Sequence, residues 1–525
     1  MARKLPIGIQ SFEKIRTGGF MYIDKTDLIY QLASSNSPYF LSRPRRFGKS
    51  LLMSTLESYF LGKKELFAEL AIENLETEWK KYPVLHLDLN AENYNSIESL
   101  ERILNEHLCF WENKYGASES ETSLSLRFKG IIRRAHEQTG AQTVVLIDEY
   151  DKPLLQTIGN EELQNQYKNI LKAFYGALKS ADAHLRFVFL TGVTKFGQVS
   201  VFSDLNQLKD ISMDARYATI CGITDKELRR DFQPELEALA ANEGLSYEEV
   251  CQKMKRMYDG YHFRHNMEGL YNPFSVLNAL DSAEFGSYWF STGTPTFLVQ
   301  LLKETDYDLR NLEGIELPVN QFADYRTDAD YPIPVIYQSG YLTIKGYDKE
   351  FQSYTLGFPN EEVKYGFLNF LVPYYTGVSS NENLFNIRHF VNELRSGDAN
   401  AFLTRLRAFF AGIPYELNDK TERHYQAIFY LVFRLLGQYI DVEERSAKGR
   451  ADAVVKTKDY VYVFEFKLEG DVDEALKQID EKGYLLPYSV DERKLMKIGV
   501  SFDSTERNIG EWKIVKKFPY IFCVY

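Results

Sequence analysis

Three consecutive residues, Gly48-Lys49-Ser50, stand between a short apolar run and a helical pattern. In such a turn, backbone N–H groups and the N-terminus of the following helix bind phosphate oxygens. We expect Lys49 to reach the β and γ phosphates of ATP and the Ser50 hydroxyl to ligate Mg²⁺. Arg46 and Phe47 precede them in the same loop and are expected to be among the nucleotide-binding residues.

The loop departs from the usual pattern GxxxxGK[ST] at its first position, where this chain has Arg43 instead of glycine. Arg45 and Arg46 add two positive charges, which either contact the nucleotide or a neighbouring molecule, or form a solvated basic loop. Because the triplet Gly-Lys-Ser also occurs by chance, the assignment depends on a second motif.

That second motif is the pair Asp148 and Glu149, which follows an apolar, β-branched run at residues 143–147. Such a run is typical of a strand buried on both faces of a parallel sheet, and ligands bind at the carboxyl ends of these strands. Asp148 is expected to hold Mg²⁺ through water, and Glu149 to orient or deprotonate the attacking water. A solvated turn would explain the carboxylates but not the apolar strand before them. Thr191 ends another apolar run and is either a γ-phosphate sensor or a strand-terminal cap.

A second set of reactive side chains lies near the C-terminus. Glu465 and Lys467 are two residues apart in the otherwise apolar run 460–468, so in a strand they share one face. A carboxylate and an ammonium in such a strand are costly to bury unless they are paired or metal-bound. Asp452 belongs to the preceding expected strand and converges with Glu465 if residues 458–459 form a hairpin turn.

The two carboxylates of Asp452 and Glu465 suit Mg²⁺ or Mn²⁺. The metal would polarise a scissile phosphate, and Lys467 would position the attacking water or offset developing charge. Glu422, on the preceding expected helix, completes the metal shell in this hypothesis. His424 beside it either assists or is structural. The alternative is an edge hairpin with a surface ladder of glutamate and lysine.

The elements that position these residues change in order along the chain. Helical patterns alternate with short apolar strands over the first 220 or so residues, which predicts an α/β domain with a parallel sheet. A mostly helical, aromatic-rich region follows. After it comes a long expected helix, then strands, a helix and strands. We therefore expect three regions: a P-loop domain at 1–223, a helical middle or lid region at 224–400 and an α/β domain at 401–525.

Seven short stretches resemble the bacterial AAA-ATPase-like family, over roughly residues 5–300. They are LPIGIQSF (5–12), YIDKT (22–26), RPRRFGKS (43–50), DEYD (148–151), CGIT (221–224), YDGY (258–261) and YNPF (271–274). An arginine-rich P-loop is the usual form in that family, so the resemblance accounts for Arg43. It implies an ATP-binding fold of the P-loop NTPase type.

The C-terminal stretches GRADAVV (449–455) and YVYVFEFK (460–467) resemble the core of PD-(D/E)XK phosphodiesterases. Gln478, on the helix expected after the strand, resembles the glutamine that often follows this motif, and Tyr484 comes shortly after it. The resemblance implies a nuclease-like α/β domain. Its catalytic residues would be Asp452, Glu465, Lys467 and Gln478.

Composition limits the classes of protein that remain. The net charge of −12 argues against general coating by nucleic acid, although a local basic groove is compatible with it. The four cysteines form no CxxC pair, which fits a reducing compartment and indicates neither a zinc site nor a disulfide framework. Neither a secretory signal nor an apolar stretch of membrane-spanning length is present, so we expect a cytoplasmic protein without membrane contact.

The leading hypothesis is an ATP-hydrolysing protein whose metal-dependent nuclease-like tail acts on DNA or RNA, in mobile-element or defence biology. The alternative is an ATP-controlled signalling or scaffolding switch whose tail binds nucleic acid without cutting it. Both are compatible with oligomerisation. A small-molecule transferase or kinase is a third reading, but the sequence shows no acceptor-site motif for it.

Overall fold

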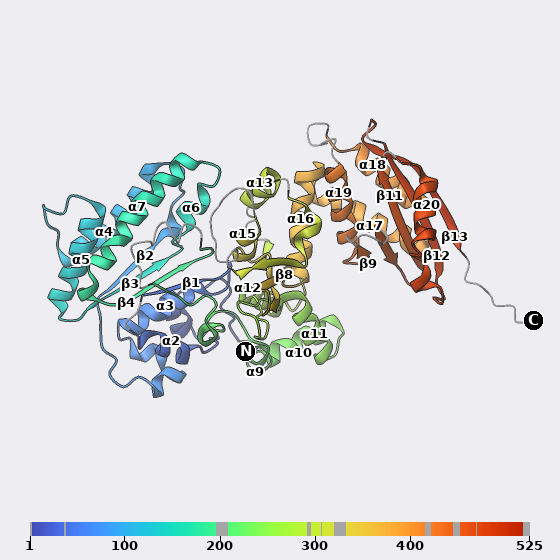
Figure 1. The fold of residues 1–525 in the computed structure, drawn as a ribbon. Coiled ribbons are helices and arrows are strands. Elements are labelled where there is room, and N and C mark those ends of the chain that lie inside the picture. Colours follow the sequence, from blue (N-terminus) through green and yellow to red (C-terminus); the bar gives the residue numbers. More distant parts are fainter. Residues whose placement is uncertain are drawn as a thin grey trace, which may run out of the picture. The chain divides into compact units, whose positions relative to one another are not determined.

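The structure is a computed structural model, and it describes residues 3–35, 38–195, 208–290, 296–305, 307–319, 332–414, 422–444, 452–468, 470–503 and 505–517. The chain forms two compact units (Figure 1). Unit 1 comprises residues 1–305 and 314–362, and unit 2 comprises residues 306–313 and 363–525. The expected region boundaries at residues 223 and 400 stay predictions. Within the described residues, no helix is both long and apolar enough to cross a membrane.

A five-stranded parallel sheet forms the N-terminal part of unit 1 (Figure 1). Its strands lie in the order β2 (Val84–Asp88), β3 (Thr143–Asp148), β4 (Leu185–Gly192), β1 (Tyr39–Ser42) and β5 (Lys209–Asp210). Every neighbouring pair is parallel. β3 is buried along its whole length, as its apolar sequence predicts for an inner strand of such a sheet. The predicted α/β domain with a parallel sheet is confirmed.

Helices cover both faces of this sheet. One face packs against α4 (Ile97–Tyr115), α5 (Leu124–Thr139) and α7 (Glu161–Ser180) in the main apolar core. The other face packs against α3 (Lys49–Phe60), where the rings of Phe60 and Phe187 lie 5.0 Å apart. Short elements on the N-terminal side and after β3 complete this part: α1 (Phe12–Thr17), α2 (Thr26–Ala33) and α6 (Lys152–Gln156). The carboxyl ends of β1, β3 and β4 therefore meet at one edge of the sheet.

The middle part of unit 1 is mostly helical, as predicted. Its helices are α9 (Asp225–Asp231), α10 (Gln233–Glu243), α11 (Tyr247–Tyr258), α12 (Pro273–Ser282), α13 (Thr296–Glu304) and α15 (Ile333–Gln338). It also holds a small antiparallel sheet that the sequence analysis did not predict, in the order β6 (Ile315–Pro318), β8 (Ser353–Gly357), β7 (Thr343–Asp348). The strands are short and β7 contains a glycine, which is uncommon inside strands.

Unit 2 contains a five-stranded mixed sheet in the order β13 (Asn508–Lys517), β12 (Lys494–Asp503), β11 (Tyr460–Leu468), β10 (Ala453–Lys456) and β9 (Asp441–Glu444). Only β11 and β12 pair in parallel, and α20 (Val472–Glu481) connects them. The other helices are α16 (Glu361–Thr376), whose first two residues belong to unit 1, α17 (Ser380–Ser396), α18 (Ala399–Ala411) and α19 (Glu422–Leu436). The predicted nuclease-like α/β fold is confirmed, with β9 as an additional strand. The first three residues of the stretch GRADAVV (449–455) lie outside the described ranges.

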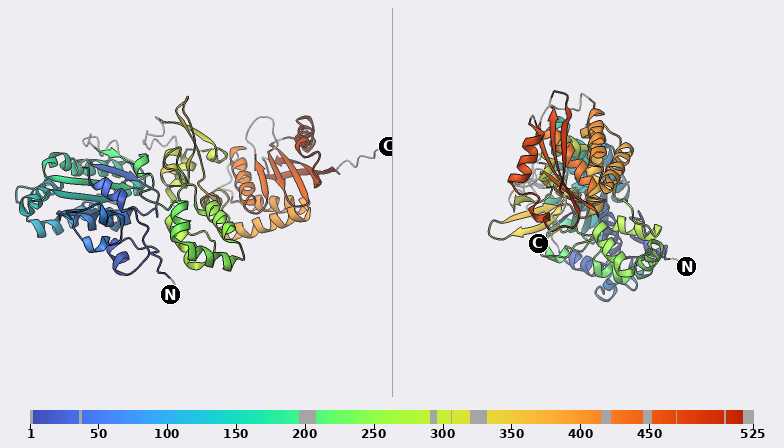
Figure 2. Two further views of the ribbon diagram at one scale, coloured as in Figure 1. Left: turned by 90° about the horizontal axis from the view of Figure 1, so that it is seen from below. Right: turned by 90° about the vertical axis from the view of Figure 1, so that its right-hand side faces the viewer.

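Helices cover both faces of this sheet too (Figure 2). Phe464 and Phe466 point toward α18 and α19, where Phe464 contacts Phe402 and Phe466 contacts Phe429. Val461 and Val463 point to the opposite face and pack with α20. The pleat therefore places Glu465 and Lys467, which follow Val463 at alternate positions, on the α20 face. α20 lies so close that a Cβ on Gly499 of β12 would stand 2.6 Å from the Val472 carbonyl oxygen.

Candidate nucleotide and metal sites

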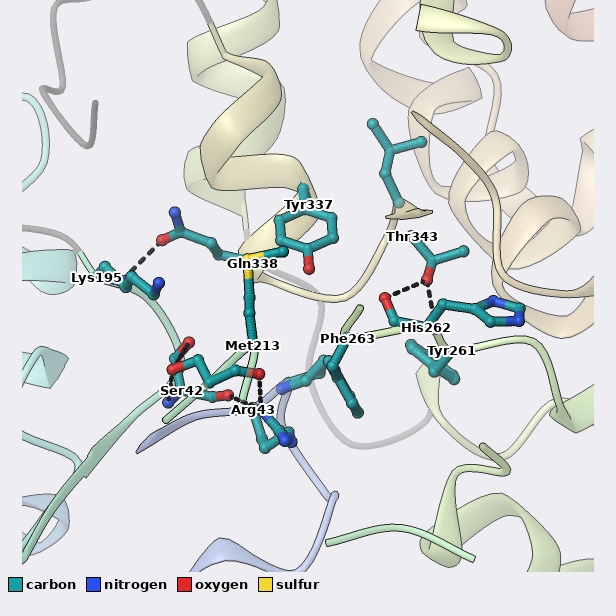
Figure 3. A pocket seen from close by; sticks show the side chains of 13 residues that line it. Ser42, Arg43, Lys195, Met213, Tyr261, His262, Phe263, Tyr337, Gln338 and Thr343 are labelled. Carbon is teal, nitrogen blue, oxygen red and sulfur yellow. Dashed lines mark hydrogen bonds between the residues drawn. The ribbon is translucent and has the colours of Figure 1, made fainter. Parts of the chain in front are cut away.

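The P-loop follows β1 and leads into α3, and Arg43 anchors its start. This side chain is buried, and its Nη1 donates to the carbonyls of Ser42 (2.8 Å) and Ser212 (2.9 Å). The guanidinium carbon lies 4.0 Å from the centre of the Phe263 ring. Arg43 lines a small pocket on this side of the loop (Figure 3) and is absent from the lining of the cleft described below. The residue that replaces glycine thus ties the loop to the middle part of unit 1, and burial lowers its pKa.

Phe47, like Arg43, ties the P-loop to the middle part of unit 1. Its ring is buried and meets the rings of Tyr261 and Phe263 edge-on, at 4.9 and 5.2 Å between centroids. Its side chain therefore faces the protein interior, so it could serve a nucleotide only through its backbone. Gly48, the next residue, is the N-cap of α3 with a φ of 93°, a conformation in which glycine carries no steric penalty.

Lys49 folds back over the loop that precedes it. Its ammonium donates to the carbonyls of Arg43 (3.2 Å) and Pro44 (3.3 Å). It also lies 3.3 Å from Oε1 of Glu149, which comes from the turn after β3. The structure thus brings the predicted phosphate-binding lysine and the predicted water-orienting glutamate into one ion pair.

The end of β3 is joined to the end of β4 through Asp148. This carboxylate is 4% exposed, and its Oδ1 accepts hydrogen bonds from the Thr191 hydroxyl and from the Glu149 N–H (3.0 Å). Both alternatives stated for Thr191 are compatible with this contact, since a sensor side chain and a strand-terminal cap both lie at this place. Glu149 has a φ of 53°, in the left-handed region that non-glycine residues seldom adopt.

A cleft of about 400 Å³ opens beside these residues. It is lined by Gly48, Lys49, Ser50 and Glu149, and also by Arg45 and Arg46. The guanidinium of Arg46 also lies 4.9 Å from the ring centre of Phe274, the second residue of α12. A volume of this size is typical of small-molecule sites.

Three groups of residues in this cleft were missed by the sequence analysis. They are the N-terminal segment 6–10, the α12 residues Pro273, Phe274 and Leu277, and the pair Lys152 and Asn90. The Lys152 ammonium donates to Oδ1 of Asn90 (3.1 Å), and burial lowers its pKa. Apart from Leu277, the first two groups fall in stretches 5–12 and 271–274, which carried the family resemblance, so that resemblance was the available signal.

An apolar pocket of about 110 Å³ adjoins the cleft. The two share Pro6, Gly48, Leu51, Pro273 and Leu277 as lining residues. Further lining residues come from the stretch 15–29 and from the loop before α9, among them Met21, Ile23, Ile29, Ile220 and Ile223. The combination of a cleft with basic lining residues and an adjoining apolar pocket suits a ligand with phosphates at one end and a flat ring at the other.

The second site lies at one end of β11 in unit 2, and it collects four predicted residues. Asp452 directly precedes β10, and the pairing of Ala453 with Phe464 places it opposite Glu465. Its Oδ2 accepts from the Phe466 N–H at 2.8 Å. The amide of Gln478, on α20, donates to Glu465 and accepts from Lys467.

Glu465 is the most buried member of this group, at 3% exposed. Its Oε1 lies 3.6 Å from the Lys467 ammonium, whereas its Oε2 is buried without a hydrogen-bond partner among the described residues. Burial, and next the charge of Asp452, raise the pKa of Glu465 to about 7. A buried carboxylate oxygen without a partner is unfavourable unless a cation or water binds it.

Two family models match the chain: "Predicted AAA-ATPase" over residues 6–202 and "PD-(D/E)XK nuclease superfamily" over residues 420–512. The Azotobacter chroococcum mcd 1 protein named "Uncharacterized protein in vnfD 5'region" is 35% identical over 527 residues, which cover 97% of this chain and 98% of that protein. The chain belongs to the AAA-ATPase-like family. Both resemblances seen in the sequence are confirmed, so this family member joins an ATPase-type domain to a nuclease-superfamily domain.

Among solved structures, the chain matches the ORC2 protein of Aeropyrum pernix in ADPNP–ADP complexes. The two chains are 10% identical, and the match covers 65% of this chain and 90% of that chain with a TM-score of 0.26. This likeness is too low to bear on the fold or function of the AAA-ATPase-like chain.

The nuclease-superfamily domain implies a divalent metal, and the residues at β11 fit one. Two carboxylates face each other there, and one oxygen of Glu465 is buried and unpaired. Within the described residues, no cluster of three or more His, Cys, Asp or Glu side chains stands ready for a metal. The side chain of Glu422, the predicted third acid, lies outside the described residues.

Proposed function

We propose that this AAA-ATPase-like protein binds and hydrolyses ATP in the cleft of unit 1 and cuts nucleic acid at the carboxylate site of unit 2. The observation that carries the proposal is the convergence of Asp452, Glu465, Lys467 and Gln478 around an unpaired, buried carboxylate oxygen. A surface ladder of glutamate and lysine would leave Glu465 solvated rather than 3% exposed.

In the ATP cleft, the ion pair between Lys49 and Glu149 is the state of the site before ATP binds. The phosphates would take the place of Glu149 at the Lys49 ammonium, because a triphosphate carries more charge and more acceptor oxygens than one carboxylate. Glu149 would then be free to orient the attacking water, while Ser50 and Asp148 hold the site of Mg²⁺. The apolar pocket lined by Pro6 and Leu277 would receive the adenine ring.

In unit 2, Asp452 and Glu465 would hold the metal, which polarises the scissile phosphate and activates a water. Lys467 lies 3.6 Å from Glu465 and would offset charge that develops at the phosphate. Gln478 keeps both side chains in place through its amide. DNA and RNA are both candidate substrates. A role in mobile-element or defence biology and a cytoplasmic location stay predictions.

The test uses the full-length protein with labelled single- and double-stranded DNA and RNA, in Mg²⁺ or Mn²⁺, with and without ATP. Asp452→Ala, Glu465→Ala and Lys467→Ala should each lower cleavage by on the order of 10³-fold or more, because residues of one site act as a unit. Lys458→Ala is the matched control, since Lys458 is exposed in the turn at the other end of β11. All variants should hydrolyse ATP at the wild-type rate.

A wild-type protein that cuts none of these substrates, yet binds them in a salt-sensitive way, would replace this proposal with the ATP-controlled switch. Cleavage that survives Glu465→Ala would place the nuclease site elsewhere. The ATP half is tested by Lys49→Ala, which should weaken ATP binding by about 10- to 100-fold, the effect expected for lost charge-assisted hydrogen bonds.

A further inference from the structure

Asp151 is a fully buried carboxylate at the edge of the ATP cleft, and the roles described above do not include it. Its relative exposure is 0%. Oδ1 accepts from the Val193 N–H at 3.2 Å, and Oδ2 accepts from both the N–H (2.6 Å) and the hydroxyl (2.7 Å) of Thr194. The sequence left a solvated turn open at this position, whereas the structure encloses the side chain. A buried charge with three donors is an organised contact, since a carboxylate left unpaired there would be strongly unfavourable.

The contact joins the turn after β3 to the segment after β4. Two hydrogen bonds from Tyr150 follow the same path, from its N–H to the Thr191 carbonyl (3.0 Å) and from its hydroxyl to the Thr194 carbonyl (3.2 Å). Gly192 leaves the space that this arrangement needs: a Cβ there would stand 2.6 Å from Oδ1 of Asp151 and 2.7 Å from the Tyr150 ring. The two strand ends are therefore clamped by side chains as well as by the sheet.

The clamp acts on Glu149, the residue proposed above to orient the attacking water. Glu149 lies two positions before Asp151, and its backbone is in the left-handed region with a φ of 53°. The Lys152 N–H donates to the Glu149 carbonyl at 3.0 Å, which closes a tight turn around the two residues. On the other side of the contact, Val193, which directly follows β4, lines the same cleft as Glu149. An unfavourable backbone conformation at a functional residue persists only where the surroundings hold it.

We propose that Asp151 is a positioning residue for ATP hydrolysis: by binding Val193 and Thr194, it fixes the turn that aims Glu149 at the site of the attacking water. The inference rests on the ATPase activity proposed above. Asp151 itself does not line the cleft, so it acts through Glu149 and touches no substrate. A carboxylate suits this position because all three of its partners donate. An asparagine amide would turn its own N–H groups toward at least one donor.

The variant Asp151→Asn tests the inference in the full-length protein. The kcat for ATP hydrolysis should fall by about 10- to 100-fold, as for residues that orient a reacting group. The dissociation constant for ATP should stay within about threefold, because Lys49 and the P-loop are unchanged. Asp259→Asn is the matched control: it neutralises another buried aspartate of unit 1, 4% exposed, outside the cleft lining.

A double-mutant cycle distinguishes a positioning role of Asp151 from a purely structural one. If Asp151 acts through Glu149, the double variant Glu149→Gln/Asp151→Asn should hydrolyse ATP no more slowly than Glu149→Gln alone, measured over a single turnover. Where Asp151→Asn lowers the melting temperature too far, Thr194→Val replaces it. That variant removes one of the three hydrogen bonds and keeps the buried charge paired, and it should lower kcat several-fold with ATP affinity unchanged.

A wild-type protein that hydrolyses ATP while Asp151→Asn keeps the wild-type kcat overturns the inference and leaves the ATPase proposal intact. Fully multiplicative losses in the double variant likewise overturn it, because they show that the two residues act independently. A wild-type protein that binds ATP without hydrolysing it overturns the ATPase proposal and this inference together.

Discussion

Each unit holds one lysine–glutamate pair at its candidate site, and the two pairs are built differently. In unit 1, Lys49 and Glu149 are 3.3 Å apart, and they follow the carboxyl ends of two different strands, β1 and β3. In unit 2, Lys467 and Glu465 are 3.6 Å apart and stand two residues apart on the same strand. The first pair depends on the tertiary fold, whereas the second is already set by the pleat of β11.

The difference extends to how completely each pair is satisfied. Lys49 is saturated by two carbonyls and Glu149, so a ligand must displace one of these groups to reach it. Glu465 retains an unpaired Oε2, so a ligand can add to it while the contact with Lys467 remains. Unit 1 thus favours exchange of an internal anion for a bound one, and unit 2 favours addition of a cation.

The largest expected effect in this comparison comes from Glu149→Gln. The amide cannot accept a proton, so ATP hydrolysis should fall by about 10²- to 10⁴-fold, the range for lost general-base catalysis. ATP should bind at least as tightly as to the wild type, because Lys49 no longer has to give up an ion pair. Phosphate release and the binding of a fluorescent ATP analogue measure the two quantities. Weaker binding in this variant would contradict the exchange of anions at Lys49.

A smaller effect is expected from Gln478→Ala in unit 2. Gln478 contacts both Lys467 and Glu465, so its loss should loosen the pair without removing the metal ligands. Cleavage should fall by about 10- to 100-fold, and a higher Mn²⁺ concentration should restore part of it. The rate is measured on labelled nucleic acid over a titration of Mn²⁺. If the loss equals that of Glu465→Ala at every concentration, Gln478 is part of the catalytic unit rather than its support.

The contrast between the pairs also explains how much could be predicted from the sequence. Glu465, Lys467 and Asp452 could be placed together because strand periodicity and a short hairpin turn decide their positions. Asp148 and Thr191 could be placed near the P-loop because parallel strands end at the same edge of a sheet.

Features that depend on distant packing could not be predicted. The burial of Asp151 depends on donors some 40 residues later, and the turn that holds it is polar enough to look solvated. The cleft walls from the N-terminal segment and from α12 are contributed by short apolar stretches with no chemical motif. The small sheet β6–β8 likewise has little periodic signal.

A third glutamate, which is buried like Glu465, sharpens the comparison because it has no lysine among its hydrogen-bond partners. Glu362 is 3% exposed, and Oε1 accepts from the N–H groups of Tyr288 (2.6 Å) and Trp289 (2.9 Å). Oε2 accepts from the Ser275 hydroxyl at 2.7 Å. Burial raises the pKa of Glu362 to about 7, as it does for Glu465. Here all three donors are neutral, and the Ser275 hydroxyl can accept from Oε2–H when Glu362 is protonated, so the carboxyl group is satisfied in either protonation state.

The smallest expected effect is therefore on stability, in Glu362→Gln. The folded protein keeps a proton on Glu362 up to a pH of about 7, whereas the unfolded chain releases it near 4.5. This group's contribution to stability is thus full below pH 4.5 and is lost as the pH rises through 7. Glutamine can keep the three contacts and carries no charge, so the variant should gain about 1–3 kcal/mol over the wild type between pH 5 and pH 8. Urea unfolding of unit 1, followed by tryptophan fluorescence at both pH values, measures the difference.

Glu361→Gln is the matched control, because that neighbour pairs with Arg256 at 3.2 Å and is only partly buried. Equal pH dependence in the wild type and Glu362→Gln would show that Glu362 is already ionised at pH 5, and that its neutral donors stabilise the charge in spite of burial.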